Sequence, residues 1–227
     1  MVYKVSRMNN LLLLLPTLPA LHFYALSECS AQDPTSEPNP IFNYEPELEI
    51  ILRYPNLEIR RNLLVEFAAR IGTTDPQNAW LMRNQKMSQA DLLIFASTLM
   101  NIWGKTQPLK AMELAQSNPD GEFRMFITNS ALRGWAEKDH FKALEWASEN
   151  LSLYYRRTAL ATVGQVWASK DPQSACIWGA NLTNELERVF FISEVLSTWT
   201  KHNSYDAIQW YKTRLKSAAG APGGVVV

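Results

Sequence analysis

Tryptophan recurs in this chain at a fixed spacing of 32 residues. Trp103, Trp135, Trp167 and Trp199 form one series. A second series with the same spacing is Met82, Leu114, Trp146, Trp178 and Trp210. An alanine stands three residues before each member of the second series, at Ala79, Ala111, Ala143, Ala175 and Ala207. Because a fixed period of about 20 to 50 residues is the signature of tandem repeats, this spacing constrains the fold more than any single element does.

Each repeat begins with a pattern typical of a helix start. In Asp75-Pro76 and Asp171-Pro172, the aspartate can cap free N–H groups, and proline suits the first helical position because it needs no donor. Other units keep a capping residue, namely Asn43, Asp139 and Asn203. A short first helix is expected here, followed by a break and a second helix whose apolar residues recur at helical spacing.

A hairpin of two helices in 32 residues cannot bury its apolar faces alone and must stack on its neighbours. The sequence therefore predicts an all-α fold, an α-solenoid of stacked antiparallel helix hairpins. About 5.5 repeats would span residues 43–216. Each tryptophan shares a helix face with alanine, leucine or valine, so we expect both series to form core rather than a ligand-stacking surface.

The ends of the chain differ from the repeats. Residues 1–31 read as a secretory signal peptide, with basic residues before an apolar run and a small-x-small pattern at its end. Residues 32–42 read as a proline-rich linker, and residues 217–227 as a flexible tail. We expect an exported protein, periplasmic or extracellular, from a bacterial source. A retained signal or a lipidated Cys29 would instead tether it to a membrane.

Composition argues against several classes of function. The 22 basic and 22 acidic residues balance, whereas nucleic-acid binding needs a basic excess. After signal removal only Cys176 remains, which excludes a cysteine-based zinc site, and we expect it to be buried and inert. No catalytic or nucleotide-binding motif appears, so no catalysis, metal or cofactor is expected. We interpret His140 and His202 as exposed residues at repeat junctions.

The repeat resembles those of a known class. A helix-turn-helix unit with a small residue in its first helix is similar to tetratricopeptide, Sel1-like and HEAT-like repeats. The pattern W-A-x-x-D-P-x-x-A-x-x-W-A, present from Trp135-Ala136 through Asp139 and Ala143 to Trp146-Ala147, also resembles poorly characterised repeat proteins exported by some bacteria. The tetratricopeptide resemblance implies a scaffold whose first helices line a concave surface for a peptide or protein.

The candidate binding surface consists of first-helix residues expected to face away from neighbouring repeats. They are Gln77, Lys110, Glu113, Phe141, Lys142, Glu145, Gln173, Tyr205 and Asp206. An ordinary solvated helix face would look the same, so both interpretations stay open.

Four arginines share one phase of the repeat, near the start of the second helices: Arg60, Arg124, Arg156 and Arg188. A structural role would direct each guanidinium to carbonyls ending the preceding helix or to a carboxylate such as a capping aspartate of an adjacent repeat. A functional role would form a ladder for an acidic or phosphorylated segment. Leu92 interrupts the series and favours the structural role. Glu185 and Glu187 are expected to be surface charges at a helix start.

These observations favour an exported, non-catalytic helical-repeat scaffold that binds a protein or peptide of unknown identity. One alternative is a cell-envelope enzyme on an α-superhelical scaffold that acts on polysaccharide. Another is a structural protein that self-assembles into homo-oligomers through its uncapped end.

Overall fold

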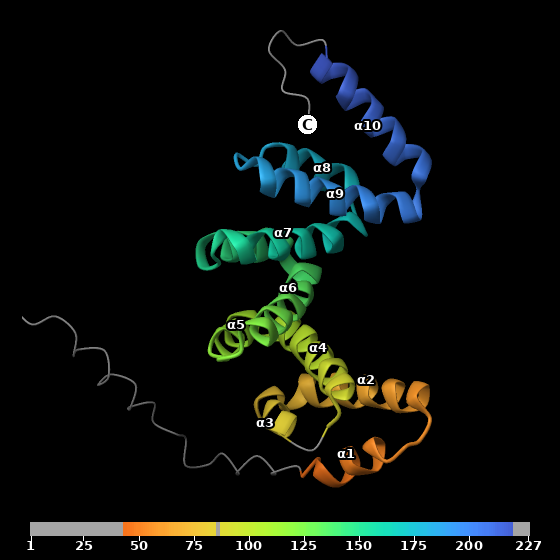
Figure 1. Cartoon of the computed structure of the whole chain (residues 1–227), viewed down its shortest axis with the longest axis vertical. Coiled ribbons are helices and arrows are strands. Elements are labelled where there is room, and N and C mark those ends of the chain that lie inside the picture. The colour runs from red at the N-terminus through yellow and green to blue at the C-terminus, as the bar shows by residue number, and fades with distance from the viewer. Residues whose placement is uncertain (1–42, 85–86, 220–227) are drawn as a thin grey trace, which may run out of the picture. The chain divides into compact units, whose positions relative to one another are not determined.

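The computed structural model describes residues 43–84 and 87–219, and these residues are helical without any strand (Figure 1). The helices are α1 (Glu45–Leu52), α2 (Leu57–Thr74), α3 (Pro76–Leu81), the 3₁₀ turn η1 (Met82–Asn84), α4 (Gln89–Thr106), α5 (Pro108–Gln116), α6 (Gly121–Asn150), α7 (Leu153–Ala168), α8 (Pro172–Ala180), α9 (Glu185–His202) and α10 (Ser204–Ala219). The all-α prediction is therefore confirmed.

Some predictions fall on other parts of the chain. The expected signal peptide at 1–31 and linker at 32–42 lie outside the described residues, as do residues 220–227 of the expected tail. Helix α10 ends at Ala219, so it continues past residue 216, where we expected the repeats to stop. Among the residues described, none of the helices combines the length and apolarity that a membrane crossing requires.

Helices meet at a recurring backbone break. The residues at these breaks have φ between −139° and −151° and ψ between 67° and 88°, and they are Asp75, Gln107, Asp139, Asp171 and Asn203. The predicted starts at Pro76 and Pro172 are confirmed, because Asp75 and Asp171 accept hydrogen bonds from the backbone three residues on. Asp139 does the same inside α6, which therefore consists of two helical segments.

A second set of caps begins the longer helices. Asn56, Ser88, Asp120 and Asn184 are the N-caps of α2, α4, α6 and α9, and each side chain accepts from backbone N–H groups of the first turn. Ser152 precedes α7 without such a bond. These caps satisfy donors that would otherwise be unpaired at a helix N-terminus. The sequence analysis did not identify them.

The long helices pack in chain order. Helix α2 packs against α4, α4 against α6, α6 against α7, and α7 against α9, while the short helices α3, α5 and α8 pack against the long helix that follows each of them. Figure 1 shows the helices by label. Each long helix therefore buries apolar surface against the next long helix.

Tryptophan and alanine fill the space between these helices, as predicted. Trp103, Trp135, Trp167 and Trp199 are at most 8% exposed, and the five alanines of the repeat are at most 1% exposed. Trp135 and Trp146 lie 6.3 Å apart at their ring centroids. The pairs Trp167–Trp178 and Trp199–Trp210 have nearly the same separation and angle. Each long-helix tryptophan here contacts the tryptophan of the next short helix or helical segment.

Cys176 is buried among these apolar residues, as predicted. Burial raises the pKa of its thiol to about 12. The thiolate is the reactive form of cysteine, so this thiol is unreactive near neutral pH.

Helices α4 and α6 approach at two glycines. A Cβ atom on Gly104 would overlap the backbone carbonyl of Ala131, and a Cβ on Gly134 would overlap the carbonyl of Asn101. Because both obstacles are backbone atoms, a side chain at either position would force the two helices apart.

We predict that Gly104→Ala destabilises the protein by about 1–3 kcal/mol or more, because it overpacks this crossing. Gly121→Ala is the matched control, since the nearest atom to its added Cβ lies 3.6 Å away. It should stay within about 0.5 kcal/mol of the parent. Urea denaturation of both variants measures the difference, and equal free energies of unfolding would contradict the close crossing.

Candidate functional site

All nine residues of the predicted first-helix surface are exposed. Phe141 is 56% exposed and Tyr205 is 70% exposed. Lys142 forms an ion pair with Asp139, and Asp206 accepts a hydrogen bond from Asn203. Across the described part of the chain, no hydrogen bond, ion pair or ring contact joins two of the nine residues. The structure therefore exposes this surface without gathering its side chains into one cluster.

His140 differs from its expected exposure. Its ring is half-buried and stacks on Trp167 with 4.2 Å between centroids, and Phe141 lies beside it. Desolvation lowers the pKa of His140, although Asp139 acts in the opposite direction. The imidazole is therefore neutral near pH 7 and forms part of the packing. His202 is exposed, as predicted.

No metal site is evident from the described side chains. Within residues 43–84 and 87–219, no group of three or more His, Cys, Asp or Glu side chains is placed to hold an ion.

The four repeat-phase arginines share one position and one kind of contact. Each is the fourth residue of its helix, α2, α6, α7 or α9. Each donates from a terminal guanidinium nitrogen to a carbonyl oxygen at the end of the preceding helical segment or in the turn after it. The pairs are Arg60–Tyr54 at 3.0 Å, Arg124–Asn118 at 2.8 Å, Arg156–Ser148 at 3.0 Å and Arg188–Leu182 at 2.8 Å.

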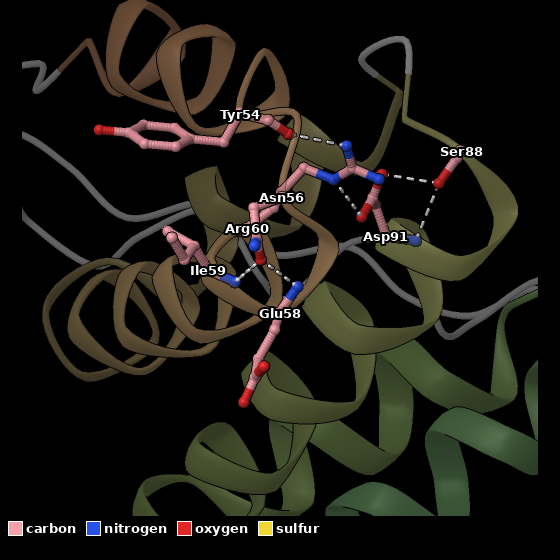
Figure 2. A network of polar contacts seen from close by, with 7 residues as sticks. All are labelled: Tyr54, Asn56, Glu58, Ile59, Arg60, Ser88 and Asp91. Carbon is pink, nitrogen blue, oxygen red and sulfur yellow. Dashed lines mark hydrogen bonds and ion pairs between the residues drawn. The ribbon is translucent and has the colours of Figure 1, made fainter.

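Two of these arginines also reach a carboxylate on the next long helix. Arg60 Nε donates to Asp91 of α4 at 3.1 Å, and Arg156 Nε donates to Glu187 of α9 at 2.5 Å. Figure 2 shows the first pair, with Ser88 donating its hydroxyl to the same carboxylate at 2.6 Å. Asp91 and Glu187 are each 7% exposed. These buried, charge-assisted contacts tie consecutive long helices together.

The interpretation of Glu187 as a surface charge is therefore wrong. It is the third residue of α9, where its backbone N–H is capped by Asn184 and its side chain meets Arg156. Glu185, two residues earlier, is exposed as expected. The carboxylate partners are thus third residues of long helices and not capping aspartates of first helices. The spacing Ser88-x-x-Asp91, similar to a capping box, was the available signal in the sequence.

A pocket of about 680 Å³ lies on the long helices, toward their C-terminal ends. Helices α4, α6, α7 and α9 and the turn after α7 supply its lining: Lys105, Arg133, Glu137, Gln165, Val166, Ser169, Lys170, Thr198 and Lys201. The lining has four cationic side chains and one carboxylate, a formal net charge of +3. We call this pocket the cationic groove. None of its residues was predicted as a site residue, because the sequence analysis placed the binding surface on the first helices.

Most cations of the groove are already engaged. Lys105 pairs with Glu137 at 2.8 Å, and Lys170 donates to the backbone carbonyl of Glu137 at 2.5 Å. Arg133 donates to the Gln165 side chain at 3.2 Å. Lys201 has no hydrogen-bond or ion-pair partner among the described residues. The groove therefore offers one unengaged ammonium beside a positively charged lining, which suits an anionic ligand.

Comparison of the chain with family models, with curated proteins and with solved structures gives no match. The functional assignment therefore rests on the residues and geometry of this chain.

We predict that Glu187→Gln costs about 1.5–3 kcal/mol of stability, because it weakens a buried hydrogen bond between two charged groups. Glu185→Gln is the same chemical change on an exposed residue of the same helix and should stay within about 0.5 kcal/mol. Chemical denaturation of the two variants makes the comparison. Equal, small effects would show that the Arg156–Glu187 contact contributes little to holding α7 and α9 together.

Proposed function

We propose that residues 43–216 form an α-solenoid with a period of 32 residues. The recurring backbone breaks, the recurring N-caps and the similar Trp–Trp pairs support this arrangement. Side-chain contacts between residues 31 to 33 positions apart join successive long helices. In this proposal each long helix is the second helix of a hairpin.

We further propose that the protein is a non-catalytic scaffold that binds an acidic segment of another protein in the cationic groove. The observation that carries this function is the groove itself, a pocket of about 680 Å³ with a net charge of +3 across four elements. Its size is within the range of ligand pockets, about 300–1,000 Å³. Carboxylates or phosphates of an extended segment would replace the weak Arg133–Gln165 contact and engage Lys201.

The exposed first-helix surface is a second candidate for protein binding. Phe141 and Tyr205 are large rings left exposed on it, and aromatic side chains are enriched in protein interfaces. This surface and the cationic groove occupy different helices, so mutations can separate them.

We also propose that the protein is exported to the periplasm or the extracellular space. The signal-like residues 1–31 support this location.

The groove is tested with the full mature chain and a fluorescein-labelled peptide of alternating Asp and Gly, beside an Asn/Gly peptide. The variant Arg133→Glu/Lys201→Glu reverses two charges of the groove. We expect it to lose at least about tenfold in affinity for the Asp peptide, because two charge-assisted contacts become repulsive.

The matched control is Lys138→Glu/Lys142→Glu, which makes the same charge change at exposed lysines outside the groove. It should change affinity by less than about twofold, since exposed charges contribute little. Equal losses in both variants would reduce the effect to overall charge and contradict a specific groove. Loss only in the control would move the binding site to the first helices.

A further inference from the structure

Arg188 is the last member of the arginine series, and its Nε has no partner. This nitrogen is buried without a hydrogen bond, whereas the Nε atoms of Arg60 and Arg156 donate to Asp91 and Glu187. The terminal nitrogen of Arg188 donates to Leu182, as its counterparts do to the ends of their preceding helices. The guanidinium is thus anchored in the common manner, and only the carboxylate is missing.

The other arginine without a carboxylate has a different neighbour. The third residue of α7 is Tyr155, and Arg124 and Tyr155 line the same small pocket. Arg124 is therefore covered by the next long helix. For Arg188, the described residues supply no long helix after α10.

Two apolar side chains are exposed at the same place. Ile208 on α10 is 46% exposed, although residues in the same phase of the preceding repeats are at most 3% exposed: Trp80, Met112, Leu144 and Cys176. Val189, the fifth residue of α9, is 39% exposed, while the fifth residues of α4 and α6, Leu93 and Met125, are half-buried.

The exposure of Ile208 has a direct structural reason. In the preceding repeats the long helix that follows a short helix packs against it, as α4 does on α3 and α9 on α8. A long helix after α10 would cover Ile208 and Val189, and its third residue would lie at Arg188 Nε. An unpartnered buried donor and two exposed apolar residues therefore indicate the same position.

We infer that the surface formed by Arg188, Val189 and Ile208, here called the α9–α10 surface, binds one amphipathic helix of another protein. This helix has an Asp or Glu as its third residue, and the carboxylate accepts a hydrogen bond from Arg188 Nε. Charge complementarity identifies this chemistry, because a third-residue carboxylate engages the equivalent Nε at Arg60 and at Arg156. The inference uses residues outside the cationic groove and goes beyond the proposed function.

The chain itself provides a suitable probe. Helix α7 packs against α6, where Leu132 occupies the repeat position that Leu196 occupies in α9. A peptide of residues 152–168, stapled on its solvent side to hold the helix, can carry Glu or Gln in place of Tyr155. The two labelled peptides differ only in the charge presented to Arg188, and circular dichroism verifies that both are helical.

Fluorescence anisotropy with the full chain should show the Glu peptide binding at least about tenfold more tightly than the Gln peptide. Arg188→Met should remove that difference, whereas Arg53→Met, a change at an exposed arginine of the N-terminal hairpin, should preserve it. In ¹⁵N spectra the Nε resonance of Arg188 should shift on addition of the Glu peptide and not of the Gln peptide.

Three results would overturn the inference. One is absence of binding by the helical Glu peptide, and another is equal affinity of the two peptides. The third is concentration-dependent dimerisation of the chain that Arg188→Met abolishes, which would assign the surface to a second copy. Because the charge reversals of the groove leave Arg188 unchanged, failure of either proposal can be recognised separately.

Discussion

The structure depends on burial of each long helix against the long helix that follows it. A hairpin of a short and a long helix leaves one face of the long helix uncovered, and the next long helix covers it. Fully buried residues such as Phe95, Leu99 and Trp103 therefore owe their burial to neighbouring repeats as much as to their own hairpin. Stability is consequently shared between repeats, and a helix with no successor exposes apolar surface, as α10 does at Ile208.

Polar contacts add alignment to this apolar packing. An arginine at the fourth position of one long helix meets the third position of the next, and the residue types at these positions correspond. Asp91 and Glu187 follow arginines, whereas Phe123 occupies the third position of α6 after Leu92 of α4. A buried carboxylate thus appears where a guanidinium can pair with it, because an unpaired buried charge would cost several kcal/mol. Arg188 departs from this correspondence.

Much of the fold could be predicted from spacing alone, because a capping Asp-Pro pair and a repeated tryptophan act within a few residues of the chain. The helix starts at Pro76 and Pro172 and the burial of Cys176 were predicted in this way. The candidate site could not be, because its partners come from different helices. Glu187 resembles a surface charge until α7 brings Arg156 to it, and the cationic groove requires α4, α6, α7 and α9 to be placed.

The central claim, a 32-residue repeat held together by successive long helices, is tested most directly by deleting residues 139–170. This deletion joins Lys138 to Asp171, so one capping aspartate replaces another and Glu187 follows Arg124 in the series. We predict a cooperatively unfolding protein with unchanged helicity per residue. A control deletion of residues 139–168 shifts the register by two residues, rotates the following helix faces by about 200° and should abolish cooperative unfolding. Equal behaviour of the two deletions in thermal circular dichroism would contradict the account.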